Sequence, residues 1–213
     1  MLSKILPLPD ERVLFIGMTG SGKTTLAVNL LKMLTNSTRI DILDTKIEPA
    51  FETIPNAVIL ESFKDVLNSD ANVRIYRPTA NEILSPDVLD RYLQYLYDNA
   101  PGLVYIDELL SLGAQAKPNP GFLNLLTRGR SRYAACWYAS QRPAWVSRFA
   151  FSEANKFFIF YLNDEKDRER VVSFTCKDVM RNPRDKHGFW FYQAGERHAI
   201  EFRNIKIIKK GEV

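Results

Sequence analysis

The sequence has few of the residues that build metal or disulfide sites. Its 213 residues include two histidines, His187 and His198, and two cysteines, Cys136 and Cys176. No metal-type spacing relates the cysteines, which argues against a zinc site or a disulfide framework and fits a reducing compartment. We therefore interpret both cysteines as small buried residues and both histidines as structural.

Long hydrophobic runs are also lacking. No apolar run reaches the roughly 20 residues needed to cross a membrane, and the N-terminus shows no secretory signal with a small-residue cleavage site. There is no internal repeat and no low-complexity linker. We expect a soluble, intracellular protein with no membrane span. It should form a single domain over residues 1–213, with a lead-in at 1–11 and a terminal hairpin and basic tail at 187–213.

The composition is that of an ordered globular protein. Hydrophobic residues make up 46%, charged residues 25% and aromatic residues 12% of the chain, which argues against disorder. The net charge of +4 and the isoelectric point of about 9.0 permit an anionic partner such as nucleic acid, but do not establish one.

Apolar runs alternate with helical patterns along the chain, which is typical of a mostly parallel sheet covered by helices. Strands are expected at 12–16, 39–43, 58–60, 72–76, 102–106, 134–139 and 156–162, and a terminal hairpin at 187–193 and 197–202. Helices are expected at 23–35, 62–68, 85–99, 122–130 and 164–173, with Ser85 as an N-cap and a loop at 113–121.

Residues 17–24 match the phosphate-binding motif G-x-x-x-x-G-K-[ST] at every fixed position, between an expected strand and an expected helix. Its glycines permit backbone angles that turn successive N–H groups toward phosphates. Lys23 would reach the β- and γ-phosphates, and the Thr24 hydroxyl would ligate Mg²⁺. The ATP-binding residues expected here are Gly17, Met18, Thr19, Gly20, Ser21, Gly22, Lys23, Thr24 and Thr25. The sequence therefore predicts an α/β, three-layer, RecA-like P-loop NTPase with a mostly parallel central sheet and a C-terminal β-hairpin.

Two carboxylates follow the apolar run at 103–106. Asp107 is placed to hold Mg²⁺ through water, and Glu108 to polarise an attacking water. A glutamate poised for water favours ATP hydrolysis over transfer of phosphate to a small molecule.

Gln141 follows the strand expected at 134–139. If that strand is parallel to the one ending at Asp107, Gln141 lies level with the γ-phosphate, which it can sense through its amide. An arginine cluster, Arg128, Arg130 and Arg132, precedes the strand. One of these planar cations could act as an arginine finger in a neighbouring subunit, and another could contact a nucleic acid backbone. Arg74 and Arg77 are the alternative fingers.

Several motifs together resemble the FtsK–HerA superfamily of DNA-pumping ATPases. They are the phosphate loop, Asp44-Thr45-Lys46 after the second strand, Asp107-Glu108, and an arginine (Arg130) eleven residues before Gln141 in Ser140-Gln141-Arg142-Pro143. Thr45 stands where the family has proline. The resemblance covers roughly residues 12–172 and is greatest to the genome-packaging ATPases of tailless, membrane-containing icosahedral viruses.

This resemblance implies a ring of five or six copies that moves double-stranded DNA. The DNA would be held through its phosphate backbone without sequence preference, and capsid or portal-vertex proteins are further partners. It assigns Lys23 and Thr24 to nucleotide and Mg²⁺, Asp107 and Glu108 to hydrolysis, Gln141 to γ-phosphate sensing, and Arg130 to a finger acting in trans. The location implied is the host cytoplasm, with virion association as an extension. Lys117, in the loop at 113–121, is a candidate DNA contact.

Three other functions stay open on the sequence. A secretion or phage-assembly motor has a related core but usually carries a membrane segment. A small-molecule P-loop kinase fits the length, and residues 128–132 resemble a lid, but Glu108 and Gln141 argue against it. A nucleotide-gated scaffold without enzymatic activity is disfavoured because every hydrolytic group is present.

Overall fold

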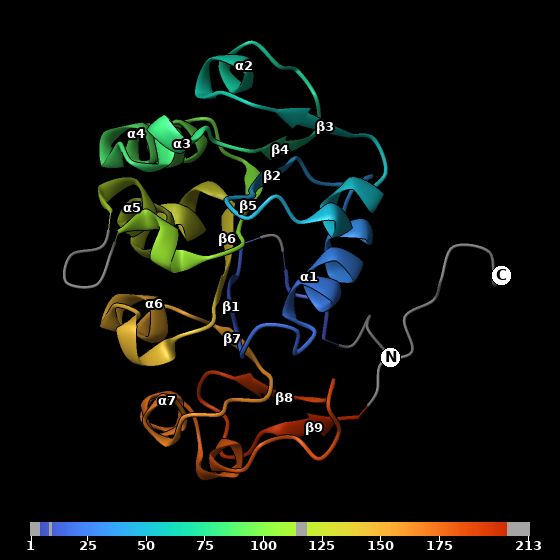
Figure 1. Cartoon of the computed structure of the whole chain (residues 1–213), viewed down its shortest axis with the longest axis vertical. Helices are drawn as coiled ribbons and strands as arrows, with labels where there is room; N and C mark the ends of the chain where they lie inside the picture. The colour runs from blue at the N-terminus through green and yellow to red at the C-terminus, as the bar shows by residue number, and fades with distance from the viewer. Residues whose placement is uncertain (1–4, 9, 114–118, 204–213) are drawn as a thin grey trace, which may run out of the picture.

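The computed structural model describes residues 5–8, 10–113 and 119–203. A nine-stranded sheet runs through the molecule in the order β3-β4-β2-β5-β6-β1-β7-β8-β9 (Figure 1). The strands are β1 (Arg12–Ile16), β2 (Ile40–Leu43), β3 (Ala57–Leu60), β4 (Val73–Tyr76), β5 (Gly102–Ile106), β6 (Ala134–Ser140), β7 (Lys156–Ile159), β8 (Phe189–Gln193) and β9 (Ile200–Phe202). Strands β1 to β7 pair in parallel, and β8 and β9 add an antiparallel hairpin at one edge.

Helices cover both faces of this sheet, so the expected three-layer α/β fold with its terminal hairpin is confirmed. Helix α1 lies on one face, and α4, α5 and α6 lie on the other (Figure 1). The helices are α1 (Lys23–Lys32), α2 (Phe63–Leu67), α3 (Ala80–Ile83), α4 (Pro86–Asp98), α5 (Pro120–Arg128), α6 (Arg148–Ser152) and α7 (Glu165–Val172).

Alternation along β1 supplies both hydrophobic cores. Val13 and Phe15 pack into the core that contains the buried face of α1, whereas Leu14 and Ile16 pack into the core under α4 and α5. All four side chains are fully buried. A strand directs successive side chains to opposite faces, so β1 is anchored in both cores. This anchoring fixes the position of the segment that begins at Gly17, directly after β1.

The structure moves several expected boundaries. Helix α5 begins at Pro120 rather than 122, because the Asn119 side chain accepts a hydrogen bond from Phe122 N and caps it. It ends at Arg128, and Gly129–Arg132 forms a separate 3-10 turn. Ser85 is the N-cap residue of α4, as expected, but its hydroxyl donates to the Asn81 carbonyl and makes no capping hydrogen bond to the helix.

Two sequence hypotheses concern residues that the structure does not describe. Lys117 and the basic tail at 206–210 both lie outside the described ranges. Within those ranges, no helix combines the length and the apolar character that crossing a membrane requires.

Candidate active site

The phosphate loop joins the end of β1 to the start of α1. Gly17 N donates to Ser140 O at the end of β6, and Met18 N donates to Tyr161 O just beyond β7. A Cβ at Gly17 would lie 2.6 Å from the Phe160 Cβ, so any side chain there would displace the backbone. Gly22 has a φ of 109° at the N-cap of α1, which favours glycine. The loop thus leads into a helix N-terminus, which attracts anions.

Lys23 folds back across this loop. Its ammonium donates to the Gly17 carbonyl at 2.7 Å and to the Met18 carbonyl at 3.0 Å. Burial, together with the nearby Lys46 ammonium, lowers the pKa of Lys23 to about 8, against the raising effect of Glu108 and Asp107. A phosphate beside this ammonium would favour its charged form.

Asp107 and Thr24 meet as the sequence predicts. The Thr24 hydroxyl donates to Asp107 Oδ1 at 3.4 Å, and the Tyr105 hydroxyl donates to the same oxygen at 3.4 Å. Among the described residues, the buried Asp107 Oδ2 has no hydrogen-bond partner. Burial raises the pKa of Asp107 to about 6.

These groups fit a magnesium ion. A hydroxyl and a carboxylate with an unpartnered oxygen are hard oxygen donors, and Mg²⁺ takes only one or two protein ligands when phosphates and waters complete its octahedron. The described part of the chain holds no cluster of three His, Cys, Asp or Glu side chains suited to a metal.

Glu108 is held by a lysine that the sequence analysis noted but gave no role. Lys46 Nζ lies 2.9 Å from Glu108 Oε2, and the Glu108 side chain is 8% exposed. Strands β2 and β5 pair directly, so the segments that follow them lie side by side. Thr45, in the place of the family's proline, joins the Ser111 hydroxyl at 2.8 Å. The sequence feature that could have pointed to a site role for Lys46 is its position just after the second strand.

Gln141 lies beside the phosphate loop, as its parallel strand requires. The register pairs Ile16 of β1 with Ser140 of β6, so the residues that follow both strands emerge at one edge of the sheet. The Thr19 hydroxyl donates to Gln141 Oε1 at 2.7 Å. The amide is therefore bonded directly to the loop.

Arg130 lies at the other end of β6, in the 3-10 turn that precedes the strand. Its side chain is 75% exposed, and its one ion-pair contact in the described structure is Asp10 at 3.8 Å. Seven strand residues separate this edge of the sheet from the phosphate loop, a distance of about 20 Å. Arg130 therefore does not reach the active site of its own chain.

The alternative fingers are engaged inside the chain. Arg74 is buried and lies 2.6 Å from Asp41. Arg77 pairs with Asp44 and Glu52, both at 2.9 Å. These contacts argue against a role for Arg74 or Arg77 as a finger.

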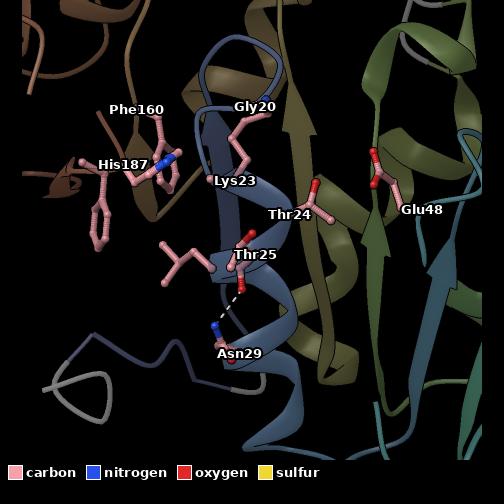
Figure 2. Close-up of a pocket in the computed structure, with 11 residues that line it drawn as sticks. Gly20, Lys23, Thr24, Thr25, Asn29, Glu48, Phe160 and His187 are labelled. Atoms are coloured by element: carbon pink, nitrogen blue, oxygen red, sulfur yellow. Dashed lines mark hydrogen bonds between the residues drawn. The ribbon is translucent and has the colours of Figure 1, made fainter. Parts of the chain in front are cut away.

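A cavity of about 450 Å³ opens beside the first two turns of α1. Figure 2 shows Thr25 and Asn29 on the side of α1 that faces His187 and Phe160, while Thr24 points the opposite way, toward Glu48. His187 is exposed and lines this cavity with Phe160 and Phe189. The sequence analysis treated His187 as structural and missed this site. Nothing near His187 in sequence marks it.

Comparison with known proteins identifies the family. The chain is 35% identical over 182 residues to the DNA packaging ATPase P9 of Enterobacteria phage PRD1, across 82% of this chain and 74% of the phage protein. The chain belongs to the family of viral DNA-packaging ATPases. This relationship decides against the kinase, secretion and scaffold alternatives, and makes the chain an ATP-hydrolysing enzyme. No protein-family model matches the sequence.

Solved structures confirm the fold of this packaging ATPase. The genome packaging NTPase B204 of Sulfolobus turreted icosahedral virus 2, in complex with ATP-gammaS, superposes with a TM-score of 0.74 at 16% identity, over 93% of this chain and all of that one. The pCW3 conjugation coupling protein TcpA, in monomer form with ATPgS, has a TM-score of 0.62 at 17% identity, over 91% of this chain and 59% of that one. At these identities the likeness concerns the fold alone.

Proposed function

We propose that this packaging ATPase moves double-stranded DNA into a capsid as a ring whose active sites are completed by neighbouring copies. The observation that carries the proposal is the position of Arg130. It is exposed, and it lies at the edge of the sheet opposite the phosphate loop, where only the nucleotide of another copy can meet it. Head-to-tail contacts of this kind form a closed ring when the rotation between successive copies closes.

Within one chain, the phosphate loop and the carboxylates after β5 divide the work of hydrolysis between them. The loop amides and Lys23 bind the phosphates. Thr24, and Asp107 through water, would hold Mg²⁺, which would neutralise phosphate charge when bound. Glu108 takes a proton from water as the water oxygen bonds to the γ-phosphorus. The bond between that phosphorus and the bridging oxygen then breaks, releasing ADP and inorganic phosphate.

Two further residues connect this chemistry to its surroundings. Gln141 senses the γ-phosphate, and its hydrogen bond to Thr19 connects it to the phosphate loop. Arg130 of an adjacent copy stabilises the charge that develops on the transferred phosphoryl group.

The DNA backbone is bound without sequence preference, so binding weakens steeply with salt. Capsid or vertex proteins dock the ring, and the host cytoplasm is the site of action.

The test is steady-state ATP hydrolysis by the purified protein, with and without double-stranded DNA, over a range of protein concentrations. A DNA-stimulated rate that rises more than linearly with protein supports shared sites. A rate per chain that does not respond to DNA and stays constant over the concentrations at which sedimentation shows single chains assembling into rings contradicts the proposal.

A further inference from the structure

We propose that Asn29 selects adenine among purine nucleotides by accepting a hydrogen bond from its 6-amino group. The inference concerns the nucleoside end of the site. It starts from the part of the cavity beside α1 that is lined by Asn29, Phe160, His187 and Phe189, none of which has a role in hydrolysis.

The cavity lies where a nucleoside must go. Thr24 and Asp107 mark the side of α1 that holds the metal and the γ-phosphate, while Thr25 and Asn29 lie on the other side, toward His187 (Figure 2). A nucleotide whose phosphates occupy the loop therefore extends its ribose and base into this cavity. Its volume of about 450 Å³ suits a small ligand.

The walls of the cavity suit a flat heterocycle. Phe160 and Phe189 are buried, with ring centroids 5.2 Å apart, and the exposed His187 lies near Gly22 at the mouth. Stacking on the exposed His187 ring binds any purine and discriminates weakly, while Phe160 and Phe189, which are 2% and 1% exposed, supply apolar contact only.

Asn29 adds the polarity that these walls lack. Its side-chain amide donates to the Thr25 carbonyl at 3.0 Å (Figure 2). Turning the amide over would set two carbonyl oxygens against each other, so this bond fixes the orientation. Among the described residues no donor contacts the Asn29 amide oxygen, and Asn29 lines the cavity. The Asn29 side-chain oxygen is thus available to accept a hydrogen bond from a ligand in the cavity.

An acceptor distinguishes the purines. Adenine carries a donor amino group at position 6, where guanine carries a carbonyl oxygen. The Asn29 oxygen therefore attracts the adenine edge and repels that of guanine. One hydrogen bond of ordinary strength corresponds to a preference of about 3- to 10-fold.

The test compares binding of ATP with that of purine riboside triphosphate, which lacks only the 6-amino group, and with that of GTP. We expect the protein to bind ATP about 3- to 10-fold more tightly than purine riboside triphosphate, and GTP more weakly still. Asn29→Ala should bring the first two affinities together. His187→Ala should weaken both in proportion, because stacking does not depend on the amino group.

Two controls isolate the effect. Asn36→Ala, at an exposed position beyond α1, should keep the preference, and competition by inorganic triphosphate should be the same in all variants because the phosphate loop is unchanged. An Asn29→Ala protein that keeps the full preference for ATP overturns the inference, as does a parent protein without one. Either result leaves ATP hydrolysis by this family standing.

Discussion

Arg130 and Gln141 stand at opposite ends of one strand, β6. Gln141 accepts a hydrogen bond from the phosphate loop of its own chain, whereas Arg130 is exposed at the far edge of the sheet. The two ends of β6 thus carry a residue suited to sense the nucleotide of its own chain and a residue suited to act on the nucleotide of a neighbouring chain. A shift of β6 in response to one nucleotide would move the finger aimed at the next.

Arg130→Ala should abolish most DNA-stimulated hydrolysis while leaving ATP binding intact. A finger supplied in trans contributes about 10³- to 10⁵-fold in related phosphoryl-transfer systems. Mixing Arg130→Ala with Lys23→Ala should restore activity, because sites form that combine an intact loop with an intact finger. Arg91→Ala, on the exposed face of α4, is the control. Failure of the mixture to recover, with rings assembled, would count against the trans finger.

Glu108→Gln should bind ATP with near-normal affinity and hydrolyse it about 10²- to 10⁴-fold more slowly, the usual contribution of a general base. Nucleotide binding by calorimetry and single-turnover hydrolysis measure the two effects separately. Glu61→Gln, an exposed position, controls for the loss of one negative charge. An unchanged single-turnover rate in the Glu108 variant would remove its assigned role.

Lys46→Met should lower the hydrolysis rate at saturating ATP by about 10-fold or more, the effect of losing a charge-assisted hydrogen bond. The ammonium orients Glu108 at 2.9 Å, and without it the carboxylate loses its fixed position. Lys64→Met, on the surface, is the matched control. A rate that rises instead would mean that the ion pair restrains Glu108.

Thr19 and Gln141 should behave as a coupled pair. Replacing either side chain removes the same 2.7 Å hydrogen bond, so Thr19→Val and Gln141→Leu together should cost less than the sum of their separate effects on kcat/KM. The expected coupling is about 0.5–1.5 kcal/mol. Strict additivity in this double-mutant cycle would show that the bond is not used during turnover.

Acid should weaken the magnesium-dependent stabilisation of the protein. The pKa of Asp107 is raised by burial from 3.8 to about 6, so the metal-free folded protein favours the protonated carboxyl. The stability that this protonation gives to the fold is lost as pH rises through about 6. Mg²⁺ needs the ionised form. The Tm increase given by Mg²⁺ with a non-hydrolysable ATP analogue should therefore shrink as pH falls through about 6. Asp107→Asn should make that increase small at every pH.

The parts of the fold that depend on local patterns were predictable from the sequence. The phosphate loop and β5, at Gly102–Ile106, were placed correctly because a motif or an apolar run marks them. Helix α3 was missed, although Thr79 and Glu82 form a capping box there, because its single turn buries no residue. The start of α5 was missed although Asn119 and Pro120 signal it.

The missed site residues are those whose roles arise from strand order. Lys46 contacts Glu108 because β2 and β5 are neighbours, and no spacing along the chain encodes that. His187 reaches the cavity because the segment before β8 returns to α1. The burial of Arg74 against Asp41 follows from the pairing of β4 with β2. Sequence patterns alone therefore left Arg74 open as a finger.

The position of β1 has a consequence for synthesis of the chain. Its partners in the sheet are β6 and β7, and the Arg12 amide bonds to Asn155, 143 residues away. The nascent phosphate loop therefore has no neighbouring strand until β6 and β7 have been synthesised. His187 and Phe189, which line the nucleoside cavity, come later still. Nucleotide can stabilise the nascent chain only after these segments have been synthesised, so ligand-assisted folding cannot begin when the phosphate loop alone has left the ribosome.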